Sequence, residues 1–412
     1  MPKRSCRTSN DASADPQLDI VSSRRHLHAY DSPLVLEVIA VLQFDTILRE
    51  VGTPALVVDL AALKRNIEKM AAIAGRSGVH LRPHAKTHKS VEIARLQIAA
   101  GALGMACATI AELEMLAAAG LPNLLLTAPT ADCAAFARLA AINRTGPITI
   151  TVDHLEQVHA AAKAVGLDQP PLSIVIDTDV GQARTGVVSI AEGVALARAI
   201  ASRPQLRFAG IQGFAGNAQH IPEPLARSMA AEKAAGVLGD FAAALAEENL
   251  RPTIITGSGT GTHAADSAGP YTELQVGSYI FMDADYARVV DETGVGLPFE
   301  PSLFVLATVV SVNRANEVTV NAGTKALATN GPPPCKILGV AAHAVYRFAG
   351  DEHGILTFPV GAALPSLGQR VLLGATHCDP TVNLHAFYHV VEATQTQIWP
   401  IAGRYGWLKA GV

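Results

Sequence analysis

The first candidate for covalent chemistry is a lysine at the end of an apolar run. The run Val79–Lys86 ends in Arg82-Pro83-His84-Ala85-Lys86, and Lys89 follows three residues later. Because nearby cations disfavour the ammonium form of a lysine, this crowding favours the neutral amine, which attacks carbonyl groups to form imines. The pattern predicts a reactive amine at Lys86, with a solvated basic loop as the alternative.

A second candidate is an arginine that lies between glycines. After the apolar run Leu172–Asp179, the sequence continues Val180-Gly181-Gln182-Ala183-Arg184-Thr185-Gly186. Glycines let the backbone approach a ligand closely, and the guanidinium group supplies a fixed positive charge. Arg184 is therefore predicted to meet an anionic ligand; in the alternative it pairs with Asp177 or Asp179.

Two glycine-containing segments indicate a phosphate site. Thr256-Gly257-Ser258-Gly259-Thr260-Gly261 follows one late apolar run, and Gln275-Val276-Gly277-Ser278-Tyr279 lies in the next. In parallel barrels, the loops after the late strands commonly hold phosphate with backbone N–H groups. Glycines also serve plain turns, so the prediction depends on where the segments lie along the chain.

A histidine and an aspartate near the C-terminus suggest a metal site. They lie in Gly374-Ala375-Thr376-His377-Cys378-Asp379-Pro380. If this segment is extended, His377 and Asp379 share one face and Cys378 points to the other. One nitrogen and one oxygen ligand suit manganese, magnesium or zinc, with water completing the shell. The alternative is a hydrogen-bonded His–Asp pair at a turn.

Apolar runs that alternate with helix-period segments must position these residues. Eight such units in an α/β chain predict a parallel (β/α)₈ barrel of the TIM type, whose reactive groups lie at the carboxyl ends of the strands. A doubly wound sheet would need a glycine loop after its first strand, and the sequence has none there. The predicted strands are Val79–Lys86, Gly104–Thr109, Asn123–Pro129, Ile148–Val152, Leu172–Asp179, Arg207–Phe214, Thr253–Gly259 and Glu273–Asp283, preceded by one extra strand, Pro54–Asp59, with the helix Leu60–Ala74.

The pattern changes after residue 297 to strand-like runs without long helices. We expect a barrel over residues 46–297 and a mostly antiparallel β domain over 298–412, which carries His377 and Asp379. Its predicted strands are Leu303–Val312, Glu317–Asn321, Ile337–Val345, Ile355–Phe358, Arg370–Leu373 and Ala386–Ala393.

Composition limits the classes of partner. The chain has 412 residues, of which 49% are apolar and 17% charged, and a net charge of −4 with no basic excess argues against nucleic acid and membrane surfaces. Its five cysteines include no CxxC pair, so neither a disulfide framework nor a thiolate zinc site is indicated, and a reducing cytoplasm fits best. Residues 1–45 are predicted to form a poorly ordered extension.

Taken in order, these segments resemble the D-threonine aldolases and their relatives, the D-3-hydroxyaspartate aldolases and the eukaryotic-type D-serine dehydratases. The resemblance runs from about Thr53 to Trp399. Its motifs, in order, are TPALVVDLAALKRNI, RPHAKTHKS, GQARTG, GIQGF…QH, GSGTG, ELQVGSYIFMDADY, DEHG and HCDPTVNLH.

The resemblance implies an alanine-racemase-like barrel with a β domain (fold type III) that binds pyridoxal 5'-phosphate (PLP). Lys86 would bind the cofactor covalently, Arg184 would meet it, and His220 would lie near the substrate. His377 and Asp379 would bind the divalent metal. The cofactor's phosphate would meet the two glycine segments, at Ser258, Gly259, Thr260, Gly277, Ser278 and Tyr279.

The resemblance also implies a reaction. Aldolases of this group typically carry His-x-Asp at the metal site and the dehydratases His-x-Cys, so Asp379 favours an aldolase that splits D-3-hydroxy amino acids into glycine and an aldehyde. The alternatives are a dehydratase that releases keto acid and ammonia, a non-catalytic PLP-binding homeostasis protein, and a racemase. Relatives are commonly homodimers. Phe214 stands where the family usually has a tyrosine near the cofactor, which puts substrate identity more in doubt than cofactor binding.

Overall fold

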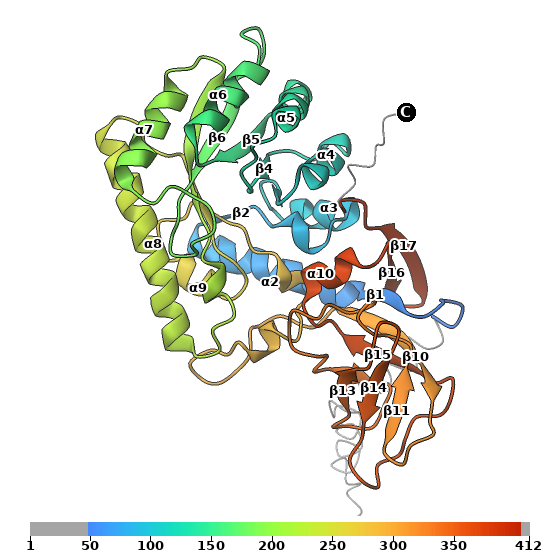
Figure 1. Cartoon of the computed structure of the whole chain (residues 1–412). Helices are drawn as coiled ribbons and strands as arrows, with labels where there is room; N and C mark the ends of the chain where they lie inside the picture. The colour runs from blue at the N-terminus through green and yellow to red at the C-terminus, as the bar shows by residue number, and fades with distance from the viewer. Residues whose placement is uncertain (1–47, 405–412) are drawn as a thin grey trace, which may run out of the picture.

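Two sheets organise the chain in the computed structural model, which describes residues 48–404 (Figure 1). The first sheet has eight parallel strands in the order β2-β9-β8-β7-β6-β5-β4-β3. Its end strands are joined by a bridge between His84 and Ala106, whose N–H donates to the Pro83 carbonyl over 2.9 Å, so the sheet closes into a barrel. The strands are β2 (His80–Leu81), β3 (Ala106–Cys107), β4 (Leu124–Leu126), β5 (Ile148–Val152), β6 (Leu172–Asp177), β7 (Leu206–Gly213), β8 (Ile254–Gly257) and β9 (Glu273–Leu274).

Helices connect the barrel strands, and side chains at the N-termini of several helices cap their free N–H groups. Asp59 accepts the N–H of Ala62 at the start of α2, and Ser189 and Glu192 form a capping box at the start of α7. The helices of the barrel are α2 (Leu60–Ser77), α3 (Val91–Ala99), α4 (Ile110–Ala118), α5 (Cys133–Thr145), α6 (Leu155–Ala164), α7 (Ile190–Ala201), α8 (Pro224–Glu247) and the short α9 (His263–Asp266).

The second sheet is mostly antiparallel and includes the first strand of the described chain. Its order is β13-β14-β11-β10-β1-β16-β17, and β15 pairs with β10 and β12. Strand β1 (Ala55–Asp59) lies between β10, to which it is antiparallel, and β16, to which it is parallel. The other strands are β10 (Leu303–Ser311), β11 (Glu317–Val320), β12 (Ile337–Leu338), β13 (Val345–Phe348), β14 (Gly354–Thr357), β15 (Arg370–Gly374), β16 (Phe387–Glu392) and β17 (Gln395–Pro400).

One hydrophobic core runs through both sheets. It includes Ile174 and Ile211 of the barrel together with Val305, Leu373 and Tyr388 of the second sheet, all of which are buried. Each large apolar side chain of this kind contributes roughly 2 kcal/mol when it is fully buried. The two parts of the molecule therefore share the apolar burial that stabilises them. In the described part of the chain, no helix is long and apolar enough to cross a membrane.

The structure confirms the predicted fold class, a parallel barrel with a mostly antiparallel second sheet. The strand predicted at Ile337–Val345 is wrong as a single element, because Gly339 and His343 have φ angles of 90° and 66° and separate β12 from β13. Strand β17 was not predicted, because its polar sequence lacks an apolar run. The predicted extension 1–45 lies outside the described residues.

Candidate active site

Lys86 lies at the carboxyl end of the first barrel strand. After β2 the chain turns into a short 3₁₀ helix, Ala85–Thr87, which begins when the imidazole of His84 accepts the backbone N–H of Lys86. The ring of His84 is fixed from its other side, where Nε2 lies 3.1 Å from the hydroxyl of Thr127. Burial and the neighbouring Lys86 hold the pKa of His84 well below its ordinary value, so this imidazole is neutral. It supports the backbone from which Lys86 projects.

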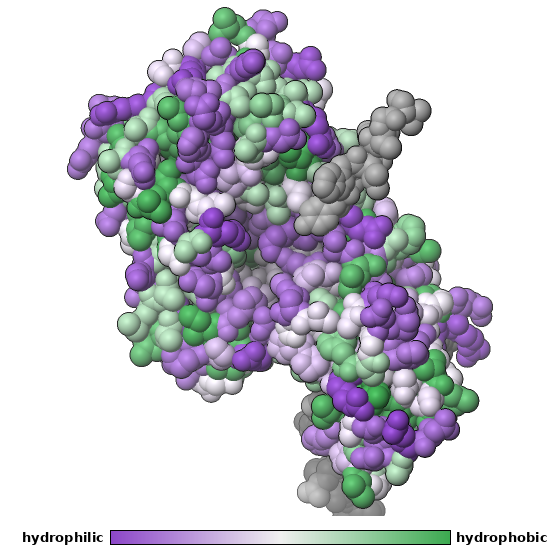
Figure 2. All heavy atoms as spheres, viewed as in Figure 1, coloured by the Kyte–Doolittle hydropathy of each residue, from purple (hydrophilic) through white to green (hydrophobic). Residues whose placement is uncertain are grey.

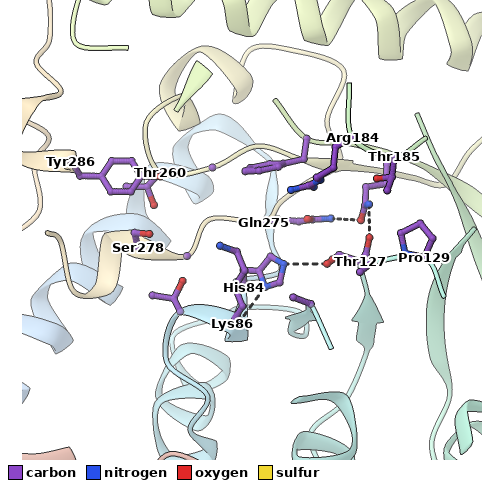
Figure 3. A pocket seen from close by; sticks show the side chains of 17 residues that line it. His84, Lys86, Thr127, Pro129, Arg184, Thr185, Thr260, Gln275, Ser278 and Tyr286 are labelled. Atoms are coloured by element: carbon purple, nitrogen blue, oxygen red, sulfur yellow. Dashed lines mark hydrogen bonds between the residues drawn. The ribbon is translucent and has the colours of Figure 1, made fainter. Parts of the chain in front are cut away.

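Lys86 lines a cavity of about 440 Å³ at this end of the barrel. Tyr286, Thr260 and Ser278 lie at one end of the cavity in Figure 3, and Thr127 and Pro129 lie at the other. On the face seen in Figure 2, hydrophilic residues gather where the barrel meets the second sheet. The full lining is His84, Lys86, Thr87, Ala108, Thr127, Ala128, Pro129, Arg184, Thr185, Gln212, Phe214, Gly259, Thr260, Gln275, Gly277, Ser278 and Tyr286.

The amine of Lys86 forms an ion pair with the carboxylate of Asp379, which comes from the far end of the sequence. The side chain of Asp379 is only 13% exposed. Burial alone would raise the pKa of this carboxyl, but Lys86 outweighs burial and lowers the pKa well below its ordinary value. Burial likewise lowers the pKa of Lys86, but Asp379 outweighs it and the net pKa is raised. In this state the lysine is an ammonium group.

The expectation that neighbouring cations would disfavour the ammonium form of Lys86 is therefore wrong. The physical reason is that each nearby cation has its own carboxylate. Arg82 forms two bonds to Glu273, of 2.7 and 2.8 Å, and Lys89 pairs with Glu112. All four of these side chains are at least 92% buried, so the two pairs belong to the wall of the barrel.

Arg184 lies on the opposite side of the cavity from Lys86 (Figure 3). Its guanidinium carbon lies 5.9 Å from the ring centre of Phe214. The alternative ion pairs do not form: Asp177 accepts bonds from Thr185 and Gln212, and Asp179 accepts the N–H groups of Gly181 and Ala183. Arg184 is thus available to an anionic or aromatic ligand.

The glycine segments contribute Gly259, Thr260, Gly277 and Ser278 to the cavity lining. A Cβ atom at Gly277 would lie 2.5 Å from the hydroxyl of Thr87, so glycine is required for the close approach of this segment to the lysine turn. Ser258 is buried beside the lining with φ of 71°. Tyr279 is 1% exposed and absent from the lining; its hydroxyl accepts a hydrogen bond from Gln97, and its backbone N–H donates to Thr260.

These features fit PLP. The cofactor needs an amine for its aldehyde and N–H groups or cations for its phosphate. The cavity offers Lys86 and Arg184 together with the glycine-containing backbone of Gly259, Thr260, Gly277 and Ser278. Gln275 and Gln212 add neutral amides to the wall, joined by a bond of 3.1 Å.

His377 and Asp379 lie two residues apart, and the segment that holds them is only partly extended. His377 is extended, whereas residues Cys378–Asn383 form the helix α10, whose first turn contains Asp379. Pro380 suits this first turn because its missing N–H would have no partner there. Nδ1 of His377 accepts a bond of 2.9 Å from the side-chain amide of Asn330, and Asp283 accepts the N–H of Cys378.

This pair supplies one nitrogen and one carboxylate oxygen, which fit a divalent ion that keeps water in its shell. In residues 48–404, no group of three or more His, Cys, Asp or Glu side chains is arranged to hold a metal. Solvent or substrate would therefore have to complete the coordination of an ion held by His377 and Asp379.

His220 adjoins this pair from the barrel side. Its ring lies 6.5 Å from that of His377, and it packs on the ring of Tyr286 at 4.4 Å. Nδ1 of His220 lies 3.2 Å from Oδ2 of Asp285, close enough for an ion pair but not aligned for a hydrogen bond. Burial lowers the pKa of His220 more than Asp285 raises it, so the imidazole is neutral near pH 7.

Sequence reasoning missed two contributors to this site. Tyr286 lines the cavity and packs on His220, and Asp285 lies beside the same ring. Both belong to Ala284-Asp285-Tyr286, which directly follows the predicted eighth strand Glu273–Asp283. Its position at a strand end was the available signal, because reactive groups of a barrel lie there.

Two protein families match the chain in succession. The family described as "Alanine racemase, N-terminal domain" matches residues 58–285, and "Putative serine dehydratase domain" matches residues 302–391. The first match covers the barrel and the second covers most of the strands of the second sheet.

Individual relatives match over nearly their whole length. The chain is 38% identical to a D-threonine aldolase of an Arthrobacter species over 359 residues, which is 87% of this chain and 94% of that protein. It is 34% identical over 362 residues to a 3-hydroxy-D-aspartate aldolase of Paracoccus denitrificans, covering 86% of this chain and 92% of the relative. A crystal structure of a D-threonine aldolase from Filomicrobium marinum superimposes with a TM-score of 0.82 at 35% identity, over 87% of this chain and 97% of the other.

Proposed function

Because this chain belongs to the family of the D-threonine and 3-hydroxy-D-aspartate aldolases and is a PLP-type carbon–carbon lyase, we propose that it cleaves D-3-hydroxy amino acids to glycine and an aldehyde, with a divalent metal. The observation that carries this proposal is the contact of Lys86 with Asp379. It places a carboxylate of α10 against the amine of Lys86, which lines the cavity, so the groups proposed for the cofactor and for the metal lie side by side.

We propose that Lys86 binds the aldehyde of PLP, because it is the lysine of the cavity lining. Arg184 would meet the cofactor, and the phosphate would take the backbone N–H groups of the segments around Gly259, Thr260 and Ser278, with Ser258, Gly277 and Tyr279 shaping them. Bound PLP would supply an electron-withdrawing ring conjugated to the amino group of the substrate. The residues of the chain then need only orient the bond to be broken and handle protons.

His220 is the proposed base for the β-hydroxyl of the substrate. Its neutral ring can accept a proton, and Asp285 beside Nδ1 would stabilise the imidazolium that results. Tyr286, which lines the cavity, packs on the same ring and covers one side of the imidazole. A divalent ion on His377 and Asp379 would supply a Lewis acid that lowers the pKa of that hydroxyl.

Asp379 supports the aldolase over the dehydratase. The dehydratases that the chain resembles carry cysteine at this place, and here Asp379 is an ionised, oxygen-donating group because Lys86 lowers its pKa. Cys378 is buried, and burial raises the pKa of its thiol well above the ordinary value, which disfavours the thiolate that a metal would need. Oxygen ligands suit the harder divalent ions, manganese and magnesium.

The test is product analysis with purified protein, PLP, manganese and each stereoisomer of threonine, phenylserine and 3-hydroxyaspartate. We expect glycine and an aldehyde from the D-isomers only, and loss of this activity with a chelator. Keto acid and ammonia in place of glycine would replace the aldolase by the dehydratase.

Lys86→Ala tests the anchor of the cofactor independently of the substrate. The variant should lose the visible absorbance of lysine-bound PLP and the covalent label left by borohydride reduction. Lys325→Ala is the matched control, because Lys325 is 63% exposed and lies outside the cavity lining. A borohydride-fixed label that persists on another lysine of the Lys86→Ala variant would contradict the assignment.

The remaining parts of the proposal concern the setting of the reaction. The partner is a small amino acid, and neither nucleic acid nor a membrane surface is proposed, because the net charge of −4 offers no basic excess. The free thiols support a cytoplasmic enzyme, because disulfides are rare in that reducing compartment. They are Cys107, Cys133, Cys335 and Cys378. We also propose a homodimer, which light scattering would distinguish from a monomer.

A further inference from the structure

The residue before His220, Gln219, packs directly on the glycine segment of the proposed phosphate site. It follows the 3₁₀ turn Gly216–Ala218 at the end of β7, and it is 2% exposed. Its neighbour His220 faces the opposite way, toward Asp285 and Tyr286. Two consecutive residues therefore reach two different parts of the active site.

The side-chain amide of Gln219 uses both its donor and its acceptor groups on its surroundings. Oε1 accepts the N–H of Gly261 at 3.0 Å. Nε2 donates to the hydroxyl of Thr262 at 2.9 Å and to the carbonyl of Ala215 at 3.1 Å. A buried amide with three hydrogen bonds holds one orientation, because rotating it would leave several buried polar groups without partners.

The contact with Gln219 also explains why the loop has glycine at positions 259 and 261. A Cβ atom at Gly259 would lie 2.4 Å from Oε1 of Gln219, and one at Gly261 would lie 1.9 Å from the Gln219 carbonyl oxygen. Neither distance is possible for real atoms, so only glycine permits the loop to lie on Gln219. Packing on Gln219 therefore by itself requires glycine at both of these positions.

The loop is also held at Thr260, between the two glycines. Its hydroxyl accepts the N–H of Tyr279 at 3.0 Å, and its carbonyl lies 2.8 Å from Nδ1 of His263. Thr262, one residue further, donates to the carboxylate of Asp266. Gln219 is thus one of several anchors of the loop, but among those named here it is the one whose backbone continues into His220.

We propose that Gln219 is a positioning residue that sets both the phosphate-binding loop Gly259–Thr262 and the imidazole of His220. This inference rests on the proposed function. Displacement of the Gln219 side chain would move the N–H groups offered to the phosphate and, through the shared backbone, the ring that accepts the hydroxyl proton. The affinity for PLP and the rate of the reaction with PLP saturating then depend on one side chain.

The test compares Gln219→Met with a matched buried amide. Methionine has nearly the length of glutamine but makes none of its hydrogen bonds. We expect the Kd for PLP, measured by absorbance titration of the apoenzyme, to rise about tenfold or more. With PLP saturating, kcat should fall about tenfold and KM should change less than threefold, because His220 is assigned to proton transfer rather than to substrate binding.

The control is Asn143→Leu, which removes another buried amide of the barrel. Asn143 is 2% exposed and bonds to Pro170 and Ile148, outside the active site. Its variant should lower the Tm comparably yet leave Kd and kcat within twofold of wild type. If Gln219→Met fails to fold, Gln219→Glu gives the same test, since it keeps the acceptor for Gly261 but cannot donate to Thr262.

Each outcome has one meaning. Loss of both PLP affinity and kcat in the Gln219 variant supports the proposal. A change in Kd alone, or in neither quantity, overturns it, because His220 would then be set independently. Wild-type protein that neither binds PLP on Lys86 nor makes glycine overturns the proposed function instead, and that measurement is made first.

Discussion

Two cations would compete for the carboxylate of Asp379: the ammonium of Lys86 and the proposed divalent ion. In the structure the lysine holds it, and the low pKa of Asp379 follows from that contact after burial is overcome. A cation at His377 and Asp379 would have to compete with the lysine charge. The ion pair of Lys86 with Asp379 should therefore weaken the binding of a divalent ion at this carboxylate.

Removal of the Lys86 amine should strengthen metal binding. In Lys86→Ala the carboxylate of Asp379 loses its competing cation, and we expect the Kd for manganese to fall roughly tenfold, an effect of about 1.4 kcal/mol. The lysine is 39% exposed, so solvent screening keeps the effect far below that of a fully buried pair. Calorimetric titration of the cofactor-free proteins measures it. Unchanged or weaker binding in Lys86→Ala, with Lys325→Ala as reference, would show that the lysine does not compete for this carboxylate.

Asp266 should make stability depend on pH. It lies behind the glycine loop, 3% exposed, and burial raises its pKa to about 6 despite hydrogen bonds from Thr262 and Ser258. Because this value exceeds that of the unfolded chain, the folded state holds the proton more tightly, and stability falls as pH rises from about 4 through about 6. In Asp266→Asn the side chain does not ionise, so this fall in stability with rising pH should disappear. The substitution should raise the free energy of unfolding by roughly 3 kcal/mol at pH 8 and by little near pH 4.

The measurement is urea unfolding of both proteins across that pH range. Asp240→Asn, on the exposed side of α8, is the control and should give parallel curves. A difference between Asp266→Asn and wild type that stays constant with pH would mean that ionisation of Asp266 is not its cause.

Among individual residues, the sequence suffices where spacing and strand ends define a site. Lys86, Arg184, Gly259 and Gly277 were predicted, and they line one cavity. The protonation state of Lys86 was not predictable, because its partner Asp379 lies 293 residues away in sequence. Only the fold brings the two together.

Between elements, the barrel is tied at its closing strands by buried charge. Arg82, on the segment after β2, donates two hydrogen bonds to the carboxylate of Glu273 in β9. It also donates one to the carbonyl of Asn123, just before β4. Three segments of the wall therefore meet at one guanidinium group. A buried pair of this kind adds little net stability over apolar residues, but loss of one partner leaves a charge without compensation.

Glu273→Leu should therefore destabilise the protein by about 3–5 kcal/mol, because Arg82 would remain buried and unpaired. The double variant Arg82→Met/Glu273→Leu should recover most of that loss. Denaturant unfolding of the single and double variants gives the comparison. A double variant as unstable as the sum of both single variants would contradict the explanation by unpaired charge.

Element types followed from periodicity, whereas boundaries and short elements did not. All eight barrel strands were predicted, yet β2 has two residues where Val79–Lys86 was expected. Beyond Leu81 the backbone still bonds to its neighbours, through the N–H groups of Arg82 and His84, and it leaves the sheet only where the 3₁₀ turn Ala85–Thr87 begins. Helix α10 was missed because Cys378–Asn383 is too short for a helical period, and β17 because an edge strand tolerates polar residues.

The whole molecule depends on contacts between its two sheets. The main core includes residues of both, and β1 needs β10 and β16 as neighbours. A chain that ends at residue 297 would expose that core and leave β1 unpaired. We expect it to show no cooperative thermal transition, whereas the full chain unfolds in a single step.

Calorimetry and circular dichroism check this prediction. Two separate transitions in the full chain, or a folded fragment ending at residue 297 with the helix content of the barrel, would mean that the barrel is stable by itself. The fragment would still lack His377 and Asp379, so activity is not the readout.

The placement of β1 also bears on the order in which the protein is made. On the ribosome, β1 emerges before the barrel, and β16 emerges after almost everything else. The hydrogen-bonding edge of β1 that β16 will occupy therefore stays open throughout synthesis of the barrel. A newly made chain would expose an apolar strand edge for that interval, the kind of surface that chaperones bind, and the last strands to be translated are those that close it.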